Sequence, residues 1–134
     1  MKEDKKYIKH AYDLDVYQRM FRVSKVIIKK VIPKLPQNEK YDLVDQMRRA
    51  SKAAVAILSE GFPKRFQQRH RDKYITDSLG ECEEMITHLM YVRDVYSEYV
   101  IPESTQILID EYERSMSQLN SLSKSWKQYH KNKK

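Results

Sequence analysis

Three carboxylates and one histidine recur at helical spacing in the second half of the chain. Asp77, Glu81, Glu84 and His88 are separated by four, three and four residues, which places them on one face of a helix. Carboxylate oxygens and an imidazole nitrogen in such a line can ligate a metal ion. A di-iron bundle needs a Glu-x-x-His pair on each of two helices, however, and this chain has no such pair. We therefore expect an acidic surface that complements the basic first helix of a neighbouring subunit, and no metal or other cofactor.

The basic residues are concentrated in two segments of a chain whose formal net charge is +7. Residues 1–36 carry ten Lys or Arg against four Asp or Glu, and residues 64–73 carry five against one, whereas residues 74–101 carry six acidic groups and one basic group. Such basic segments neutralise phosphates and give a salt-dependent affinity without sequence readout. The candidate nucleic-acid-binding residues are Arg19, Arg22, Lys25, Lys29, Lys30, Lys64, Arg65, Arg69, Arg71 and Lys73.

Aromatic residues are interleaved with the second basic segment. Phe66, His70 and Tyr74 could stack on bases beside the cations. The alternative is a solvated basic face whose aromatic side chains turn into the protein, and the sequence leaves both interpretations open.

Two further arginines, Arg48 and Arg49, lie in a segment rich in Ala and Ser. They could bind phosphate, but we favour a structural role. In that role they pair with Asp77, Glu81 and Glu84, in the same subunit or in a neighbouring one.

Nothing in the chain has the pattern of an enzyme. It contains no Gly-rich phosphate loop, no Ser/His/Asp arrangement and no paired catalytic carboxylates. The single cysteine, Cys82, lies on an apolar stripe and is expected to be an inert buried thiol. One cysteine allows no internal disulfide, and no run of 18 apolar residues is present. We expect a cytoplasmic, non-catalytic protein with no membrane segment.

The scarcity of glycine and proline predicts long helices. A first helix is expected over 13–32, with Asp13 as its N-cap and with Tyr17 and Phe21 on its apolar stripe. A second helix is expected over 39–60, closed by Gly61 in a left-handed conformation.

Two more helices are expected over 72–99 and 102–129, the last with Pro102 in its first turn. Together the four segments predict an all-α, up-down-up-down antiparallel four-helix bundle. Residues 1–12 are expected to form a flexible arm and residues 130–134 a basic tail.

Four motifs in order resemble a known family. DLDVYQRM (13–20), QMRRA (46–50) with SEG (59–61), SLGECEE (78–84) and LNSLSKSW (119–126) resemble the 23S rRNA-intervening sequence proteins, four-helix bundles encoded within bacterial ribosomal RNA genes. The same fold family includes the accessory variability determinant of diversity-generating retroelements. That protein is a basic pentameric barrel that binds a reverse transcriptase and nucleic acid.

The resemblance implies a homopentamer with an RNA- or DNA-binding surface and no catalysis. One segment departs from the family pattern, because Ala53, Val55 and Ile57 stand where the family has Ser, Pro and Asn. Any role of that Asn does not carry over to this chain.

Our hypothesis is an accessory or scaffold protein that binds structured RNA or RNA–DNA, with a reverse transcriptase as a possible partner. The alternative is an oligomeric protein-interaction bundle with no nucleic-acid role.

Overall fold

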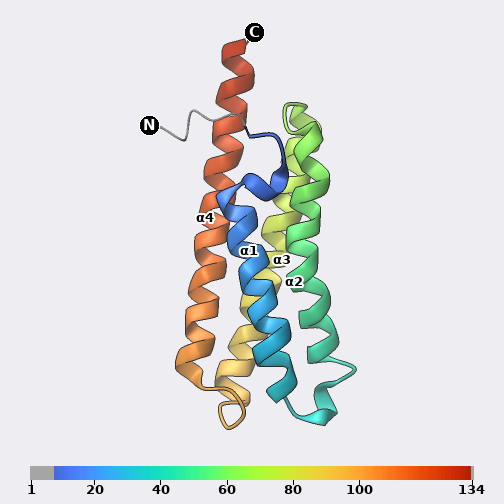
Figure 1. Ribbon diagram of the computed structural model, residues 1–134, viewed down its shortest axis with the longest axis vertical. Helices are drawn as coiled ribbons and strands as arrows, with labels where there is room; N and C mark the ends of the chain where they lie inside the picture. The colour runs from blue at the N-terminus through green and yellow to red at the C-terminus, as the bar shows by residue number, and fades with distance from the viewer. Residues whose placement is uncertain (1–7, 134) are drawn as a thin grey trace.

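The computed structural model describes residues 8–133, with side chains over residues 8–129. Part of the predicted arm (residues 1–7) and Lys134 of the predicted tail lie outside the described residues. Four helices run alternately up and down and confirm the predicted all-α bundle (Figure 1). They are α1 Asp15–Val26, α2 Leu43–Gly61, α3 Gln68–Val95 and α4 Pro102–Lys133.

The helices occupy the corners of a square. α1 packs against α2 and α4, and both of these pack against α3, so α1 and α3 lie on opposite corners. α4 is the longest helix, and its C-terminal end projects beyond the other three (Figure 1). The outer surfaces of α1 and α3 therefore face away from each other.

The core follows from the helical repeat of apolar residues. Met20, Met47, Met85, Leu89 and Tyr112 come from all four helices and are fully buried. Burial of such side chains supplies most of the stability of a bundle of this kind, because helix propensity alone is marginal.

Small residues bring α2 and α3 close together. Ser78 Oγ donates to the backbone carbonyl of Ala54 at 2.9 Å. A Cβ on Gly61 would lie 2.4 Å from Tyr74 Cβ. The predicted left-handed conformation of Gly61 is wrong, because its φ is −80° and it is the last residue of α2. Glycine is needed here for the close approach of Tyr74.

The beginning of α1 also differs from the prediction. Asp13 does not cap the helix, because it ends a 3-10 turn at Ala11–Asp13 and Leu14 takes the N-cap position. Ala11 is buried and Ile8 packs against the core, so the part of the arm nearest the bundle is folded onto it.

α1 does not end at a simple α-helical turn. A π turn at Ile27–Val31 and a 3-10 turn at Ile32–Lys34 continue it. Pro33 then prevents further hydrogen bonding of the helical type, as predicted.

The bounds of the other helices shift by a few residues. α2 follows a 3-10 turn at Gln37–Glu39, and α3 begins at Gln68, four residues earlier than predicted, because no breaker follows Pro63. α4 begins at Pro102 as predicted but continues to Lys133, four residues past the predicted end. Within residues 8–133, none of the helices combines the length and the apolar character that a bilayer crossing demands.

Candidate nucleic-acid interface

The outward side of α1, with the turns that continue it to Lys34, is strongly basic. Residues 15–34 carry six Lys or Arg and one acid, Asp15. We define the α1 basic face by its four exposed cations: Arg22, Lys25, Lys29 and Lys30. None of the four makes an ion pair with another residue in the described part of the chain. Unpaired cations on one helix face are free to meet phosphates.

Arg19 is placed differently from those four residues. Its Nη1 lies 2.5 Å from Glu111 Oε1, and its Nε donates to Gln118 Oε1 at 2.9 Å. Only a quarter of the Arg19 side chain is exposed. Its guanidinium therefore joins α1 to α4. Arg19 could bind nucleic acid, as predicted, only by giving up its bonds to Glu111 and Gln118.

Two arginines of the second basic segment (residues 64–73) make contacts with nearby residues of the same chain. The Arg65 guanidinium lies over the Phe62 ring, 3.9 Å from its centroid, and donates to the Phe62 carbonyl. Arg71 is only 3% exposed and donates to the Arg65 carbonyl at 3.2 Å. The placement of Arg71 on the binding surface is therefore wrong, because its aliphatic stem and its guanidinium are buried beneath the connection between α2 and α3.

Three predicted residues of this segment do lie on the surface. Lys64 and Arg69 are exposed. Lys73 is also exposed but donates to Asp77 Oδ2 at 2.7 Å, and this hydrogen bond raises the pKa of Lys73. Lys64 and Arg69 are therefore the cations of this segment that make neither an ion pair nor a ring contact with another described residue.

Two of the three predicted base-stacking aromatics, Phe66 and Tyr74, contribute to packing instead, and the prediction for His70 stays a prediction. Phe66 packs on Tyr129 with ring centroids 4.9 Å apart, and Tyr74 lies against Gly61. The exposed aromatic on the basic side is Phe21, at 47% exposure. Its predicted burial is wrong, because Ser24 takes the inward position at 4% exposure. The sequence signal that could have found Phe21 is the polar character of its neighbours one helical turn away, Gln18 and Lys25.

The acidic line of α3 is less regular than predicted. Glu84 bonds His88 at 3.1 Å, and His88 is buried at 8% exposure, so its predicted place on the polar face is wrong. Burial raises the pKa of Glu81, and the nearby charges of Glu84 and Asp77 raise it further. No three His, Cys, Asp or Glu side chains among the described residues are arranged to hold a metal ion.

The two arginines of α2 do not form their predicted ion pairs with α3 inside the described subunit. Arg49 pairs with Asp45 of its own helix at 2.9 Å, and its charge only partly offsets the raised pKa of Glu81. Arg48 is exposed and makes no ion pair in the described part of the chain. Pairing with the α3 carboxylates of a neighbouring subunit stays a prediction.

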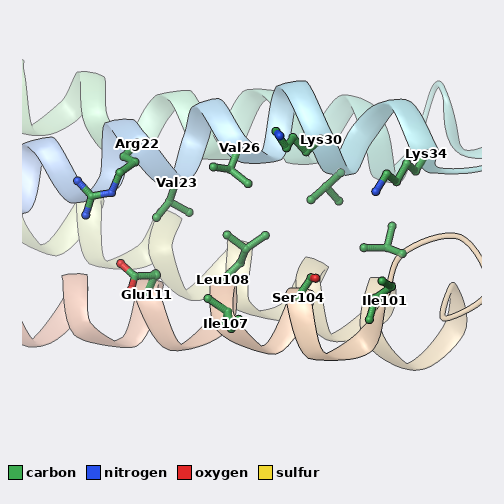
Figure 2. Close-up of a pocket in the computed structure, with 12 residues that line it drawn as sticks. Arg22, Val23, Val26, Lys30, Lys34, Ile101, Ser104, Ile107, Leu108 and Glu111 are labelled. Carbon is green, nitrogen blue, oxygen red and sulfur yellow. The ribbon is translucent and has the colours of Figure 1, made fainter.

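A groove of about 420 Å³ lies between α1 and α4, with valines and isoleucines on its walls (Figure 2). Arg22, Lys30 and Lys34 lie along its α1 side, and Glu111 lies on its α4 side (Figure 2). Ile107 is 61% exposed there. We call this feature the α1–α4 groove.

A family model described as 23S rRNA-intervening sequence protein matches residues 12–121. The chain belongs to this family. The match includes α1, α2, α3 and most of α4, so the basic face and the groove both lie within it. No curated protein and no solved structure matches the chain significantly. The relation to the accessory variability determinant stays a prediction.

Proposed function

We propose that this protein is a non-catalytic accessory or scaffold protein that binds structured RNA, or an RNA–DNA hybrid, through the α1 basic face. The observation that supports the proposal most is the set of four exposed cations without ion pairs. Such a face gives affinity for phosphates in general. The family description adds a link to ribosomal RNA genes. Sequence specificity and chemistry would then come from a partner, for which the resemblance suggests a reverse transcriptase.

The test compares two pairs of lysines that carry the same total charge. Lys25→Gln with Lys29→Gln removes two cations from the α1 basic face. Lys40→Gln with Lys124→Gln removes two exposed cations from elsewhere. Binding of a short hairpin RNA is measured by fluorescence anisotropy over a range of salt concentrations.

We expect the first pair of changes to weaken binding and to make the log–log salt dependence shallower by about 0.7–0.9 per lost phosphate contact. The control pair should leave the slope near that of the wild type. Equal effects of the two pairs would show that net charge alone matters, and the proposed face would then be wrong.

A second candidate function is supported by the α1–α4 groove. Its apolar walls and exposed Ile107 suit a protein partner better than a phosphate chain. The outer surface of α3 carries Met90, Tyr91 and Val95, each more than 40% exposed, on the same helix as Glu84. We propose that the groove receives this acidic and apolar surface of a second copy, which gives a head-to-tail contact able to close into a ring.

Light scattering with a short structured RNA at two salt concentrations separates the two functions. A closed oligomer whose RNA affinity falls steeply with salt supports both proposals. An oligomer that is indifferent to RNA supports protein interaction alone, and the +7 charge would then serve solubility.

A further inference from the structure

Phe21 is exposed although it lies at the edge of the apolar stripe of α1, whose other members are mostly buried. On the same helix face, Ser24 is buried at 4% exposure while Phe21 is 47% exposed. The Tyr17 ring lies next to Phe21, with centroids 6.0 Å apart and planes inclined by 41°. Two neighbouring aromatic side chains are therefore presented on the side of α1 that faces α2.

These rings border a hollow between α1 and α2. The hollow measures about 500 Å³, and we call it the Phe21 recess. Its α2 side includes Val55, Ala56 and Ser59, whose short side chains leave the space beside the rings open. A flat ring system could enter there and lie against Phe21.

The surroundings of the recess are mainly basic. Lys25 Nζ lies 4.6 Å from the centroid of the Phe21 ring. Lys52 lines the recess and also lines a neighbouring hollow of about 380 Å³ that contains Arg48. Lys25, Lys52 and Arg48 make no ion pair with another described residue.

Two acids line these hollows, Asp45 and Glu60. Asp45 is paired with Arg49 at 2.9 Å. Glu60 makes no ion pair with a described residue. Its single charge is outweighed by Lys52 in the same recess and by the adjacent Lys25. The net field along this side of α2 therefore favours an anionic chain.

We infer that the Phe21 recess binds an unpaired nucleobase of single-stranded RNA or DNA, stacked on Phe21, while Lys25, Lys52 and Arg48 contact the flanking phosphates. An exposed aromatic ring within a basic groove is the arrangement by which proteins hold single strands, since every base has a stacking face. Bases inside a duplex are stacked on one another and cannot enter such a hollow. This inference rests on the proposed nucleic-acid function. It assigns the paired parts of a structured RNA to the α1 basic face and its unpaired bases to the recess.

The experiment measures anisotropy with a short, labelled single-stranded RNA and with the duplex that it forms with its complement. The variants are Phe21→Ala, Phe21→Trp and, as a control, Tyr41→Ala. Tyr41 is 86% exposed and lines neither the recess nor the α1–α4 groove. Light scattering follows the mass of each variant.

The wild type should bind the single strand more tightly than the duplex. Phe21→Ala should weaken single-strand binding about 5- to 150-fold, the effect of one lost stacking contact, with the salt slope unchanged because no charge is lost. Phe21→Trp should keep the affinity, and its added emission should change when the strand binds. Tyr41→Ala should have no effect.

The outcomes distinguish this inference from the function on which it rests. If the wild type binds no RNA, the proposed function fails and the recess with it. If it binds both RNAs with a steep salt dependence and Phe21→Ala leaves the affinity for the single strand unaltered, the basic face stands and the recess is wrong. A change of mass in Phe21→Ala would make the recess a subunit contact and would also overturn the inference.

Discussion

At the scale of single residues, the two glycines provide a matched pair. A methyl group on Gly61 would overlap Tyr74 Cβ and Cγ at 2.4 and 2.6 Å, and these atoms are close to the backbone and cannot swing away. Gly61→Ala should therefore lower the free energy of unfolding by about 1–3 kcal/mol, as overpacked sites do. Urea denaturation checks this value.

Gly80 serves as the control for Gly61. It lies within α3, and a Cβ there would meet nothing within 4 Å. Gly80→Ala should raise stability by about 0.5–1 kcal/mol, because alanine loses less backbone entropy in a helix. If both substitutions changed stability equally, the close approach at Tyr74 would not be the reason for Gly61.

Cys82 gives a second prediction at this scale. Burial raises the pKa of its thiol to about 12, and Sγ lies 3.7 Å from Met20 Sδ. At mildly alkaline pH the thiol should stay protonated and should react with Ellman's reagent only after unfolding in concentrated guanidinium. Rapid reaction of the native protein would show that the α1–α3 core opens easily.

At the scale of elements, Arg19 joins α1 to α4 through Glu111 and Gln118. Arg19→Ala should lower the free energy of unfolding by about 1–2 kcal/mol, in the lower range for hydrogen bonds of charged groups because the pair is partly exposed. Arg22→Ala is the control, since Arg22 is exposed and makes no ion pair in the described chain; it should change stability by less than about 0.5 kcal/mol. Its effect should fall on RNA affinity instead. Urea denaturation measures the stability of both variants, and anisotropy measures their RNA affinity. A larger loss of stability in Arg22→Ala than in Arg19→Ala, together with a larger loss of RNA affinity in Arg19→Ala, would contradict the roles given to the two arginines.

The acidic line of α3 gives a pH prediction. The pKa of Glu81 is raised above 4.5 in the folded protein by burial and then by Glu84 and Asp77, with Arg49 opposing. The folded state therefore holds this proton to a higher pH than the unfolded chain does. The stability contributed by protonated Glu81 is present below the unfolded pKa and is lost as pH rises through the folded pKa.

Glu81→Gln should accordingly raise the free energy of unfolding at neutral pH. In the variant this free energy should also decrease less steeply above about pH 4.5, the ordinary pKa of a glutamate. Urea denaturation at a series of pH values tests this expectation. Glu83→Gln removes the same charge from an exposed position and should flatten the curve less. Identical curves for the two variants would show that the whole acidic helix, and not the burial of Glu81, sets the pH dependence.

The helices could be predicted from sequence because apolar spacing and the positions of proline determine them with little help from tertiary contacts. The rotation of α1 could also be predicted, because Met20, Ser24, Ile27 and Val31 follow one another at spacings of three and four and are buried. The width of its buried stripe could not, because the exposure of Phe21 at the edge depends on how closely α2 packs there. The burial of Arg71 was missed for a similar reason. A charged head predicts exposure, but a long aliphatic stem can lie under a connection.

At the scale of the whole molecule, α1 presents a groove on its α4 side and the Phe21 recess on its α2 side. Of the four basic-face cations, Arg22 and Lys30 line the groove, and Lys25 lies over the Phe21 ring that borders the recess. If the groove holds a second copy, Arg22 and Lys30 are partly covered in the assembly, because they line it. Lys25 and Lys29 do not line the groove, so they remain available to nucleic acid. One helix could thus serve assembly and binding together.

Ile107→Glu tests this link. Ile107 is already 61% exposed, so the change should leave the fold of the subunit intact while placing a charge in the groove. Light scattering should show a fall in mass toward a single subunit. RNA affinity should fall with it, and the salt slope should become shallower, because each particle then offers one α1 basic face to the same RNA.

Tyr41→Glu, at an 86% exposed position outside the groove, should change neither the mass nor the RNA affinity. An Ile107→Glu protein that keeps its mass would remove the groove from the assembly, and one that loses mass but keeps its salt slope would show that a single subunit carries the whole binding site.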